Sequence, residues 1–288
     1  MKLYPIQCGN FKLDGGAMFG VVPKSLWERT NPADPKNLIE LGTRSLLVED
    51  GKKLILIDCG LGNKQDEKFF GHYSLYGDES LDKNLKKFGF VREDITDVFL
   101  THLHFDHCGG AIEWNDDKTG YRPAFKNAQF WTNENHWQWA TEPNPREKAS
   151  FLKENILPMQ ESGQLQFLPT PKTGNYGFAP DLKMDVIFVD GHTEKQMLPV
   201  IQYQGKTIVF AADLIPTAGH IPQVYVMGYD TRPLLTMEEK GKFLKQCVEN
   251  EYLLFFEHDA HHELASLKMT EKGVKLDETF SFNEVFGY

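Results

Sequence analysis

Short apolar runs bounded by turn residues recur along the chain and predict a protein rich in short strands. The clearest pair, Arg44–Glu49 and Lys53–Asp58, flanks an Asp-Gly dipeptide, which is typical of a tight hairpin turn. A second pair, Leu198–Tyr203 and Thr207–Ala211, flanks a glycine and predicts another hairpin. Three more runs predict single strands, namely Asp97–Thr101, Val186–Val189 and Leu253–Phe256.

Helical periodicity falls between these strands. It occurs in four segments: Glu79–Phe88, Glu134–Thr141, Pro145–Ile156 and Thr236–Asn250. Hairpins followed by helices recur in two similar halves, which favours an α/β fold with helices outside two sheets. The sequence contains no internal repeat, low-complexity tract or Pro/Gly/Ser-rich linker. We therefore expect residues 1–288 to form a single domain.

Composition narrows the choice of partners and compartment. With 41% hydrophobic and 25% charged residues, the 288-residue chain is typical of globular proteins. Its net charge of -10 argues against nucleic acid as the main partner, because phosphate binding needs clustered Lys and Arg. No apolar run approaches the roughly 18 residues of a membrane span, so we expect no membrane partner. The sequence leaves open whether two chains form a homodimer.

The chain start and the cysteines favour a cytoplasmic protein. The first apolar run is too short and interrupted for the core of a signal peptide. The four cysteines are far apart, form no CxxC pair and are expected to be reduced; they are Cys8, Cys59, Cys108 and Cys247.

The segment 101–110 follows an apolar strand and concentrates residues that bind metals. Within six positions it carries His102, His104, Asp106 and His107. His102 and His104 share a face in extended backbone, whereas the other two are expected to begin the next turn or helix. Neutral imidazole and carboxylate suit Zn, Mn, Fe or Co. The alternative is a polar loop rich in histidine, but three of the ten histidines crowd into this stretch.

Further ligands are expected after other strands, because one short motif cannot complete two metal sites. Three predicted strands each deliver one His or Asp at or near the end. These residues are His192, Asp213 and His258.

In chain order, His-x-His-x-Asp-His, Gly-His-Thr, Ala-Ala-Asp and Glu-His-Asp resemble the metallo-β-lactamase superfamily. The resemblance runs from about Thr43 to His258 and implies a four-layer αββα sandwich with two metal ions at one edge of the sheets. Zinc is expected first, with Mn, Fe or Co as alternatives. The resemblance implies a first metal on His102, His104 and His192, a second on Asp106, His107 and His258, and Asp213 bridging both.

Two more residues are predicted to support the ligands. Asp58 matches the family's Asp-x-Gly turn, where it would accept a hydrogen bond from a ligand histidine; a turn-forming Asp is the alternative. Thr193 is predicted to act similarly or to cap a helix.

The resemblance also implies a reaction, in which a metal-bound hydroxide attacks an ester, lactone, thioester or phosphotriester. We expect Asp106 to carry the proton to the leaving alkoxide. The segments 211–217 and 226–230 are similar to those of quorum-quenching lactonases, which open N-acyl-homoserine lactones. An acyl lactone is therefore the expected substrate.

One position departs from that pattern. Better-known lactonases carry a Tyr three residues after the bridging Asp, where this chain has Pro216. Tyr225, Tyr229 or His220 would have to donate to the substrate carbonyl instead. A solvent-exposed loop is an equal alternative for His220.

The substrate-pocket prediction rests on apolar residues in two segments. Met18 and Phe19 lie in a stretch that resembles the N-terminal loop of lactonase-like members, with a plain turn as the alternative. Trp131, Trp137 and Trp139 lie where relatives insert helices near the site, although helix packing is the favoured reading for each. Four histidines without strand-end context are predicted at the surface: His72, His136, His261 and His262.

Alternative functions remain open at this point. A thioesterase of glyoxalase II type is disfavoured by the mixed charge of Thr270–Tyr288, since those relatives hold glutathione with basic residues. An organophosphate or aryl ester hydrolase is a further alternative. A non-enzymatic metal-binding or di-iron redox scaffold is disfavoured by His104, because redox members normally carry Glu there.

Overall fold

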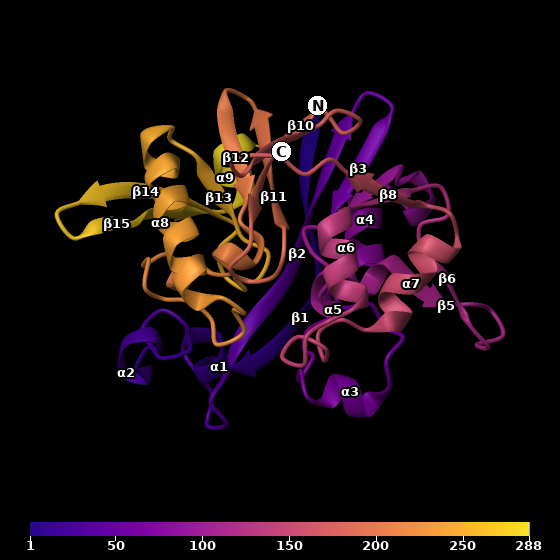
Figure 1. Ribbon diagram of the computed structural model, residues 1–288, viewed down its shortest axis with the longest axis horizontal. Helices are drawn as coiled ribbons and strands as arrows, with labels where there is room; N and C mark the ends of the chain where they lie inside the picture. The colour runs from indigo at the N-terminus through magenta and orange to yellow at the C-terminus, as the bar shows by residue number, and fades with distance from the viewer. Residues whose placement is uncertain (288) are drawn as a thin grey trace. The chain divides into compact units, whose positions relative to one another are not determined.

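The computed structural model describes residues 1–287, which fall into two compact units (Figure 1). Unit 1 contains Met1–Asn10 and Thr43–Lys183, and unit 2 contains Phe11–Gly42 and the chain from Met184. The long neighbouring strands β1 (Lys2–Asp14) and β2 (Leu38–Asp50), labelled in Figure 1, contribute residues to both units. The single-domain expectation for residues 1–288 stays a prediction.

A six-stranded sheet is the frame of unit 1, and its order is β1-β2-β3-β4-β7-β8. Its remaining strands are β3 (Lys53–Ile57), β4 (Asp97–Phe99), β7 (Gln129–Asn133) and β8 (Leu165–Leu168). The predicted β2–β3 hairpin is confirmed, with Asp50 paired to Lys53 around Gly51 at φ 65°. From β3 to β8 the strands are parallel, so their carboxyl ends share one edge.

Helices and a small hairpin complete unit 1. The helices are α3 (Glu67–Gly71), α4 (Leu81–Lys87), α5 (Phe105–Cys108), α6 (Glu134–Thr141) and α7 (Lys153–Glu161). Short 3-10 turns are η1 (Arg92–Asp94) and η2 (Gly109–Ala111), and further strands are β5 (Ile112–Trp114), β6 (Tyr121–Pro123) and β9 (Tyr176–Ala179). The apolar core of the unit includes Leu56, Val98 and Phe130.

The helix predictions succeed unevenly in unit 1. Helix α6 has the predicted bounds, and α4 is shorter than predicted. The helix predicted over Pro145–Ile156 is wrong, because only its last residues belong to α7. The Asn144 side chain accepts hydrogen bonds from the backbone N–H groups of Arg146 and Glu147, an Asx turn that competes with helix formation.

In unit 2, six neighbouring strands run in the order β15-β14-β13-β12-β11-β10. They are β10 (Met184–Val189), β11 (Gln196–Tyr203), β12 (Lys206–Phe210), β13 (Leu253–Phe255), β14 (Leu264–Thr270) and β15 (Gly273–Phe280). The predicted β11–β12 hairpin is confirmed, with positive φ at both turn residues, Gln204 and Gly205. Strands β12 and β13 are parallel, so their carboxyl ends also meet at one edge.

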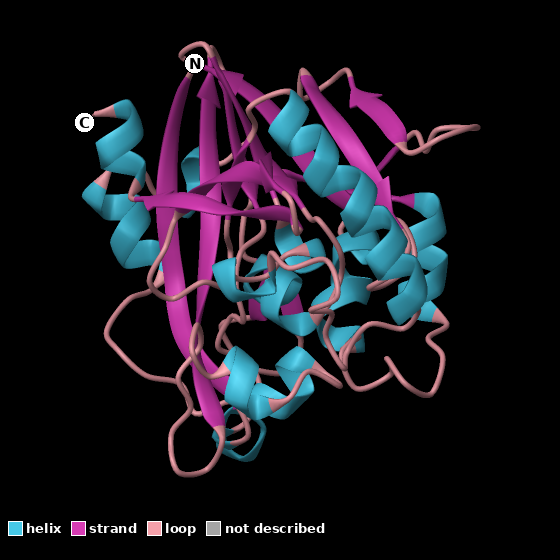
Figure 2. Cartoon of the chain, turned by 90° about the vertical axis from the view of Figure 1, so that its left-hand side faces the viewer, coloured by secondary structure: helices cyan, strands magenta, loops and turns pink. Residues whose placement is uncertain are grey.

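The helices of unit 2 are α1 (Gly15–Phe19), α2 (Lys24–Trp27), α8 (Pro233–Glu249) and α9 (Phe282–Phe286), with the 3-10 turns η3 (Ala212–Leu214) and η4 (Ala218–His220). Helix α8, predicted over Thr236–Asn250, packs on β14 and β15 (Figure 1). Each unit thus combines a sheet with helices. Figure 2 distinguishes the strands and helices of the chain by colour.

Two sequence expectations about the chain as a whole can be compared with the structure. Within residues 1–287, no helix has both the length and the apolar character needed to cross a bilayer. None of the four cysteines in this range forms a disulfide, and three of them are buried.

Candidate metal centre

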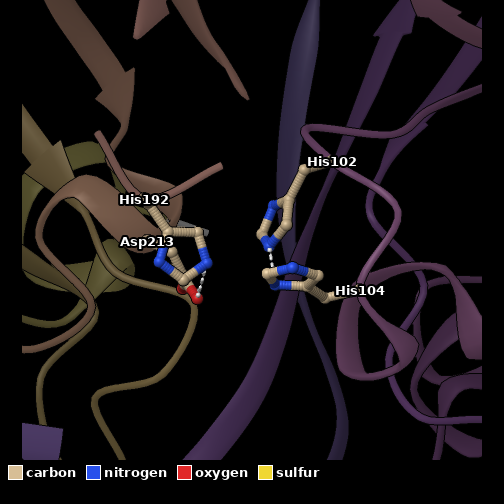
Figure 3. Close-up of side chains that lie close together, drawn as sticks. All are labelled: His102, His104, His192 and Asp213. Carbon is tan, nitrogen blue, oxygen red and sulfur yellow. Dashed lines mark hydrogen bonds and ion pairs between the residues drawn. The ribbon is translucent and has the colours of Figure 1, made fainter. Parts of the chain in front are cut away.

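His102 and His104 follow β4 at the carboxyl edge of the unit 1 sheet. Their rings meet with His102 Nε2 and His104 Nδ1 3.0 Å apart (Figure 3). The other nitrogen of His102, Nδ1, lies 3.1 Å from the Thr101 hydroxyl. The two rings therefore direct one nitrogen each toward a common point, as two ligands of one metal ion do.

Asp58 lies beneath this loop, where β3 ends. Its carboxylate is fully buried and accepts hydrogen bonds from the backbone N–H of Thr101 at 2.8 Å and its hydroxyl at 2.6 Å. His107 Nδ1 is 3.1 Å from the same carboxylate. Asp58 has φ 54°, a left-handed conformation that is unfavourable for a residue with a Cβ. These buried hydrogen bonds stabilise it, so Asp58 both shapes the turn and orients a histidine.

Asp106 and His107 lie on α5, directly after His104. His107 is fully buried, and its Nε2 is 3.9 Å from the half-buried Asp106 carboxylate. The neighbouring Cys108 is a buried residue whose thiol donates to the Leu103 carbonyl. Burial raises the pKa of the Cys108 thiol to about 12.

In unit 2 the Asp213 carboxylate joins two histidines. One oxygen lies 3.2 Å from His192 Nε2 (Figure 3), and the other lies 3.1 Å from His258 Nε2. The Nδ1 atom of His192 is 2.9 Å from Asp230, and that of His258 is 2.8 Å from the Gly42 carbonyl. Each imidazole is thus held through Nδ1 and presents Nε2 beside a different oxygen of one carboxylate.

The chemistry of these donors fits divalent cations. The candidate metal-binding residues are His102, His104, Asp106 and His107 of unit 1, and His192, Asp213 and His258 of unit 2. In His107, His192 and His258, Nδ1 lies against a protein acceptor and therefore carries the hydrogen. This tautomer leaves the lone pair of Nε2 available to a metal. Imidazole nitrogen with carboxylate oxygen is a donor set that suits Zn, Mn, Fe or Co.

Two supporting acids were missed by the sequence analysis. Asp230, 1% exposed, holds His192 and also accepts from the backbone N–H of Met227. Glu147, 3% exposed, lies 3.5 Å from His104 Nε2. Neither residue follows a strand, so the strand-end pattern that identified the candidate ligands could not find them. Asp230 is the last residue of the segment 226–230 that resembles lactonases, but that resemblance gave it no role.

Glu147 is itself held in place by its neighbours. The Trp139 indole donates to its carboxylate at 2.7 Å, and so does the Asn144 side-chain amide. Trp139, predicted as a pocket wall, therefore supports the carboxylate beside His104.

His136 corrects a sequence prediction. It was expected at the surface, but it is fully buried, and its Nε2 accepts the backbone N–H of Leu103 at 2.8 Å. The residue between the candidate ligands His102 and His104 is thereby held by a third histidine. His72 and His261 are exposed as predicted, and His262 is half-buried.

The remaining predicted residues lie as follows. Trp131 is buried with its indole donating to Asp97, Trp137 lies in the core of unit 1, and Met18 and Phe19 are buried on α1. Tyr225 is half-buried, Tyr229 is 40% exposed, and His220 is fully buried rather than in solvent. Thr193 is buried and no helix begins at it, so the capping alternative is wrong.

Replacing Glu147 by Gln is expected to weaken zinc binding about 10- to 100-fold, because the carboxylate that orients His104 becomes a neutral amide. The measurement is competition for zinc with a calibrated chelator. Glu142→Gln, at an exposed position of the same segment, is the matched control. Equal zinc affinity in both variants would show that Glu147 does not act through His104.

Comparisons with known proteins agree on one family for this chain. The sequence signature of the metallo-beta-lactamase superfamily matches residues 38–245, a range that contains six of the seven candidate ligands. An N-acyl homoserine lactonase from Bacillus thuringiensis is 23% identical over 275 residues, which cover 91% of this chain and 94% of that protein.

Solved structures share the fold over almost the whole chain. A probable metal-dependent hydrolase from Staphylococcus aureus aligns with a TM-score of 0.85 at 28% identity, covering 97% of this chain and 96% of that one. AidC, described as a dizinc quorum-quenching lactonase in complex with the product N-hexanoyl-L-homoserine, aligns with a TM-score of 0.77 at 22% identity. That alignment covers 97% of this chain and 95% of AidC.

Proposed function

Because this chain belongs to the metallo-β-lactamase superfamily, and is a metal-dependent hydrolase with that family's fold, we propose that it opens lactones of the N-acyl-homoserine type. The predicted family, αββα fold class and enzyme class are confirmed. The observation that carries the proposed chemistry is the Asp213 carboxylate, whose two oxygens each lie beside a different imidazole. The lactone substrate is supported by the similarity to N-acyl homoserine lactonases over 91% of the chain.

We propose that the two sets of candidate ligands together hold two divalent ions. In this proposal, His102, His104 and His192 would hold one ion, Asp106, His107 and His258 would hold the other, and Asp213 would contribute to both. Zinc is proposed first, because AidC is described as a dizinc enzyme. The ions would supply Lewis-acid activation of a water molecule and of the substrate carbonyl.

The residues of the chain supply orientation and proton transfer. Asp58, Asp230 and the Gly42 carbonyl each hold Nδ1 of one histidine, so the imidazoles need no reorganisation during the reaction. Asp106 is the proposed proton carrier, because its carboxylate is only half-buried and lies beside His107. It would accept the proton of the attacking water and deliver it to the leaving alkoxide.

The group that donates to the lactone carbonyl is proposed among two tyrosines. Pro216 offers no donor, and both ring nitrogens of His220 already have protein partners. Tyr225 and Tyr229 remain, of which Tyr229 is the more exposed. The proposed cellular role is the degradation of signal lactones in the cytoplasm. The formation of a homodimer stays a prediction.

The substrate proposal predicts broad activity on acyl-homoserine lactones. We expect kcat/KM to rise as the acyl chain lengthens from about four to eight carbons, since each methylene adds up to about 1 kcal/mol of apolar transfer energy. Activity on S-acyl glutathione should be much lower, because the C-terminal stretch Thr270–Tyr288 is mixed in charge and forms no basic cluster for its carboxylates. The measurement is a kinetic panel of lactones, thioesters, aryl esters and phosphotriesters on the zinc-loaded enzyme.

Each outcome of this panel has a distinct reading. A thioester that is cleaved far faster than every lactone would favour the glyoxalase II type of reaction and leave the metal site intact. A preference for phosphotriesters or aryl esters would favour that alternative in the same way. Asp106→Asn serves as the control for background hydrolysis, because it removes the proposed proton carrier.

A further inference from the structure

The loop between η4 and α8 carries Asp230, the carboxylate that holds His192. Residues 222–232 form neither helix nor strand, so this loop has no regular backbone pairing to keep it in place. Asp230 is nevertheless 1% exposed, and its carboxylate lies 2.9 Å from Nδ1 of His192. The position of the carboxylate therefore depends on what the rest of unit 2 does to hold the loop.

Helix α8 binds the first part of this loop. Lys240 of α8 is 0% exposed, and its ammonium group donates to the backbone carbonyl of Tyr225 at 2.7 Å. Three residues earlier on the helix, the carbonyl of Met237 accepts a hydrogen bond from the Gln223 side-chain amide at 3.0 Å. An added Cβ at Gly241 would collide with the Gln223 side chain. The loop and the helix are therefore in direct contact at two neighbouring points.

Lys240 also places a positive charge inside unit 2, close enough to Asp230 for the two charges to interact. Burial is the main cause that lowers the pKa of Lys240 to about 7, and the negative charge of Asp230 acts in the opposite direction. A buried ammonium is costly unless a hydrogen bond and an opposite charge compensate it. Here the Tyr225 carbonyl supplies the hydrogen bond, and the carboxylate that accepts Nδ1–H of His192 supplies the charge.

The preceding residue of α8 holds the segment on which His192 lies. The Glu239 carboxylate accepts hydrogen bonds from the backbone N–H groups of Asp190 at 2.8 Å and Gly191 at 2.9 Å. Gly191 directly precedes His192 in the chain. Two consecutive residues of one helix thus hold the segment that carries the histidine and the loop that carries its partner Asp230.

We propose that Lys240 is a positioning residue that keeps the Asp230 carboxylate on Nδ1 of His192, by binding the loop at Tyr225 and by placing a positive charge near the carboxylate. The consequence for zinc binding rests on the proposed metal-dependent function, whereas the effect on the hydrogen bond between Asp230 and His192 does not. A lysine with a merely structural role would change the stability of unit 2 and leave this hydrogen bond as it is.

The test replaces Lys240 by Met, which keeps an unbranched apolar chain but removes the charge and the N–H donors. Loss of the ammonium also removes the cost of burying it, so we expect this variant to fold. The end of the loop stays bound in any case, because the backbone N–H groups of Thr231 and Arg232 donate to the segment of His192 at 3.2 Å and 2.9 Å. Lys240→Gln, a neutral residue that keeps a donor, serves if the Met variant does not fold.

The controls separate an effect through Asp230 from a general one. Lys242→Met, at an exposed lysine of the same helix, is the matched control. Asp230→Asn is measured alone and together with Lys240→Met. One readout is the rate at which Nδ1–H of His192 exchanges with water in the metal-free protein, followed by NMR and assigned by its absence in His192→Gln. The other is stepwise zinc affinity, measured by competition with a calibrated chelator.

In the wild type we expect Nδ1–H of His192 to exchange slowly, because the histidine and Asp230 are both buried. Lys240→Met should exchange this proton about tenfold faster, since the carboxylate is held less firmly, and Lys242→Met should match the wild type. Lys240→Met should also weaken one of the two zinc-binding steps about tenfold, and Asp230→Asn should weaken it about 10- to 100-fold. The double variant should bind zinc no more weakly than Asp230→Asn alone, because the lysine acts through that carboxylate.

Three results would each overturn the inference: a wild type without a slowly exchanging His192 proton, an unchanged exchange rate in folded Lys240→Met, or losses of zinc affinity that add up in the double variant. If the wild type binds no zinc, the proposed metal centre fails separately. The exchange of Nδ1–H in the metal-free protein then decides by itself whether Lys240 holds Asp230 on His192.

Discussion

Replacing Asp213 by Asn is expected to lower kcat/KM on the order of a thousandfold and to reduce the metal content at both sites. The two oxygens of Asp213 lie 3.2 Å and 3.1 Å from the Nε2 atoms of His192 and His258. An amide keeps the shape of the side chain but turns one of these oxygens into an NH₂ group, which has no lone pair to offer a cation. The remaining carbonyl oxygen is neutral, so attraction for both ions falls.

Asp58→Asn provides the graded comparison for this prediction. Asp58 contacts Thr101 and His107 and is proposed to touch no metal, so its replacement should cost about 10- to 100-fold. Asp185→Asn, at an exposed position of β10, should leave the rate unchanged. Steady-state kinetics and elemental analysis of the purified variants measure the series. Equal and mild losses for Asp213→Asn and Asp58→Asn would remove Asp213 from the proposed ligands.

His102→Ala and His104→Ala are expected to lower activity and metal content about as much as Asp213→Asn does. The wild type should carry about two metal ions per chain, and either variant should lose much of this content. The reason is that the two rings direct nitrogens 3.0 Å apart toward one point. Removing either ring takes away one of the three imidazoles proposed for that ion. Activity should fall on the order of a thousandfold with the metal.

Metal analysis on folded protein is the measurement, with circular dichroism to establish folding. His72→Ala, at an exposed histidine outside the motif, is the control and should keep its metal. A well-folded wild type that binds no metal, and gains no activity from added Zn, Mn or Co, would refute the proposed metal centre.

The candidate ligands could be identified from the sequence because the patterns that mark them involve only neighbouring residues. Apolar runs such as Leu253–Phe256 identify buried strands within a few residues, and a polar residue at such a strand end stands out against them. His192, Asp213 and His258 were found in this way, and the parallel pairing of β12 and β13 explains why two of them come from one edge. Their grouping as ligands of two shared metal ions stays a proposal.

Strands without a strong apolar pattern were not predicted. β15 has no buried residue, and β1 buries only three of its thirteen. Such strands are held by pairing with neighbours distant in sequence or by a hairpin, rather than by their own composition. The false helix at Pro145–Ile156 has a related cause, since the Asn144 side chain offers the backbone a turn in its place.

What the sequence determined by itself is therefore the family, the main hairpins and the residue types available for metal binding, all of which depend on neighbours in the chain. The tertiary structure alone decided which side chains support those residues. Asp230 reaches His192 across 38 residues, and His136 reaches Leu103 across 33. A buried polar group takes whichever partner the fold brings within hydrogen-bonding distance, and no periodicity in the sequence encodes that distance.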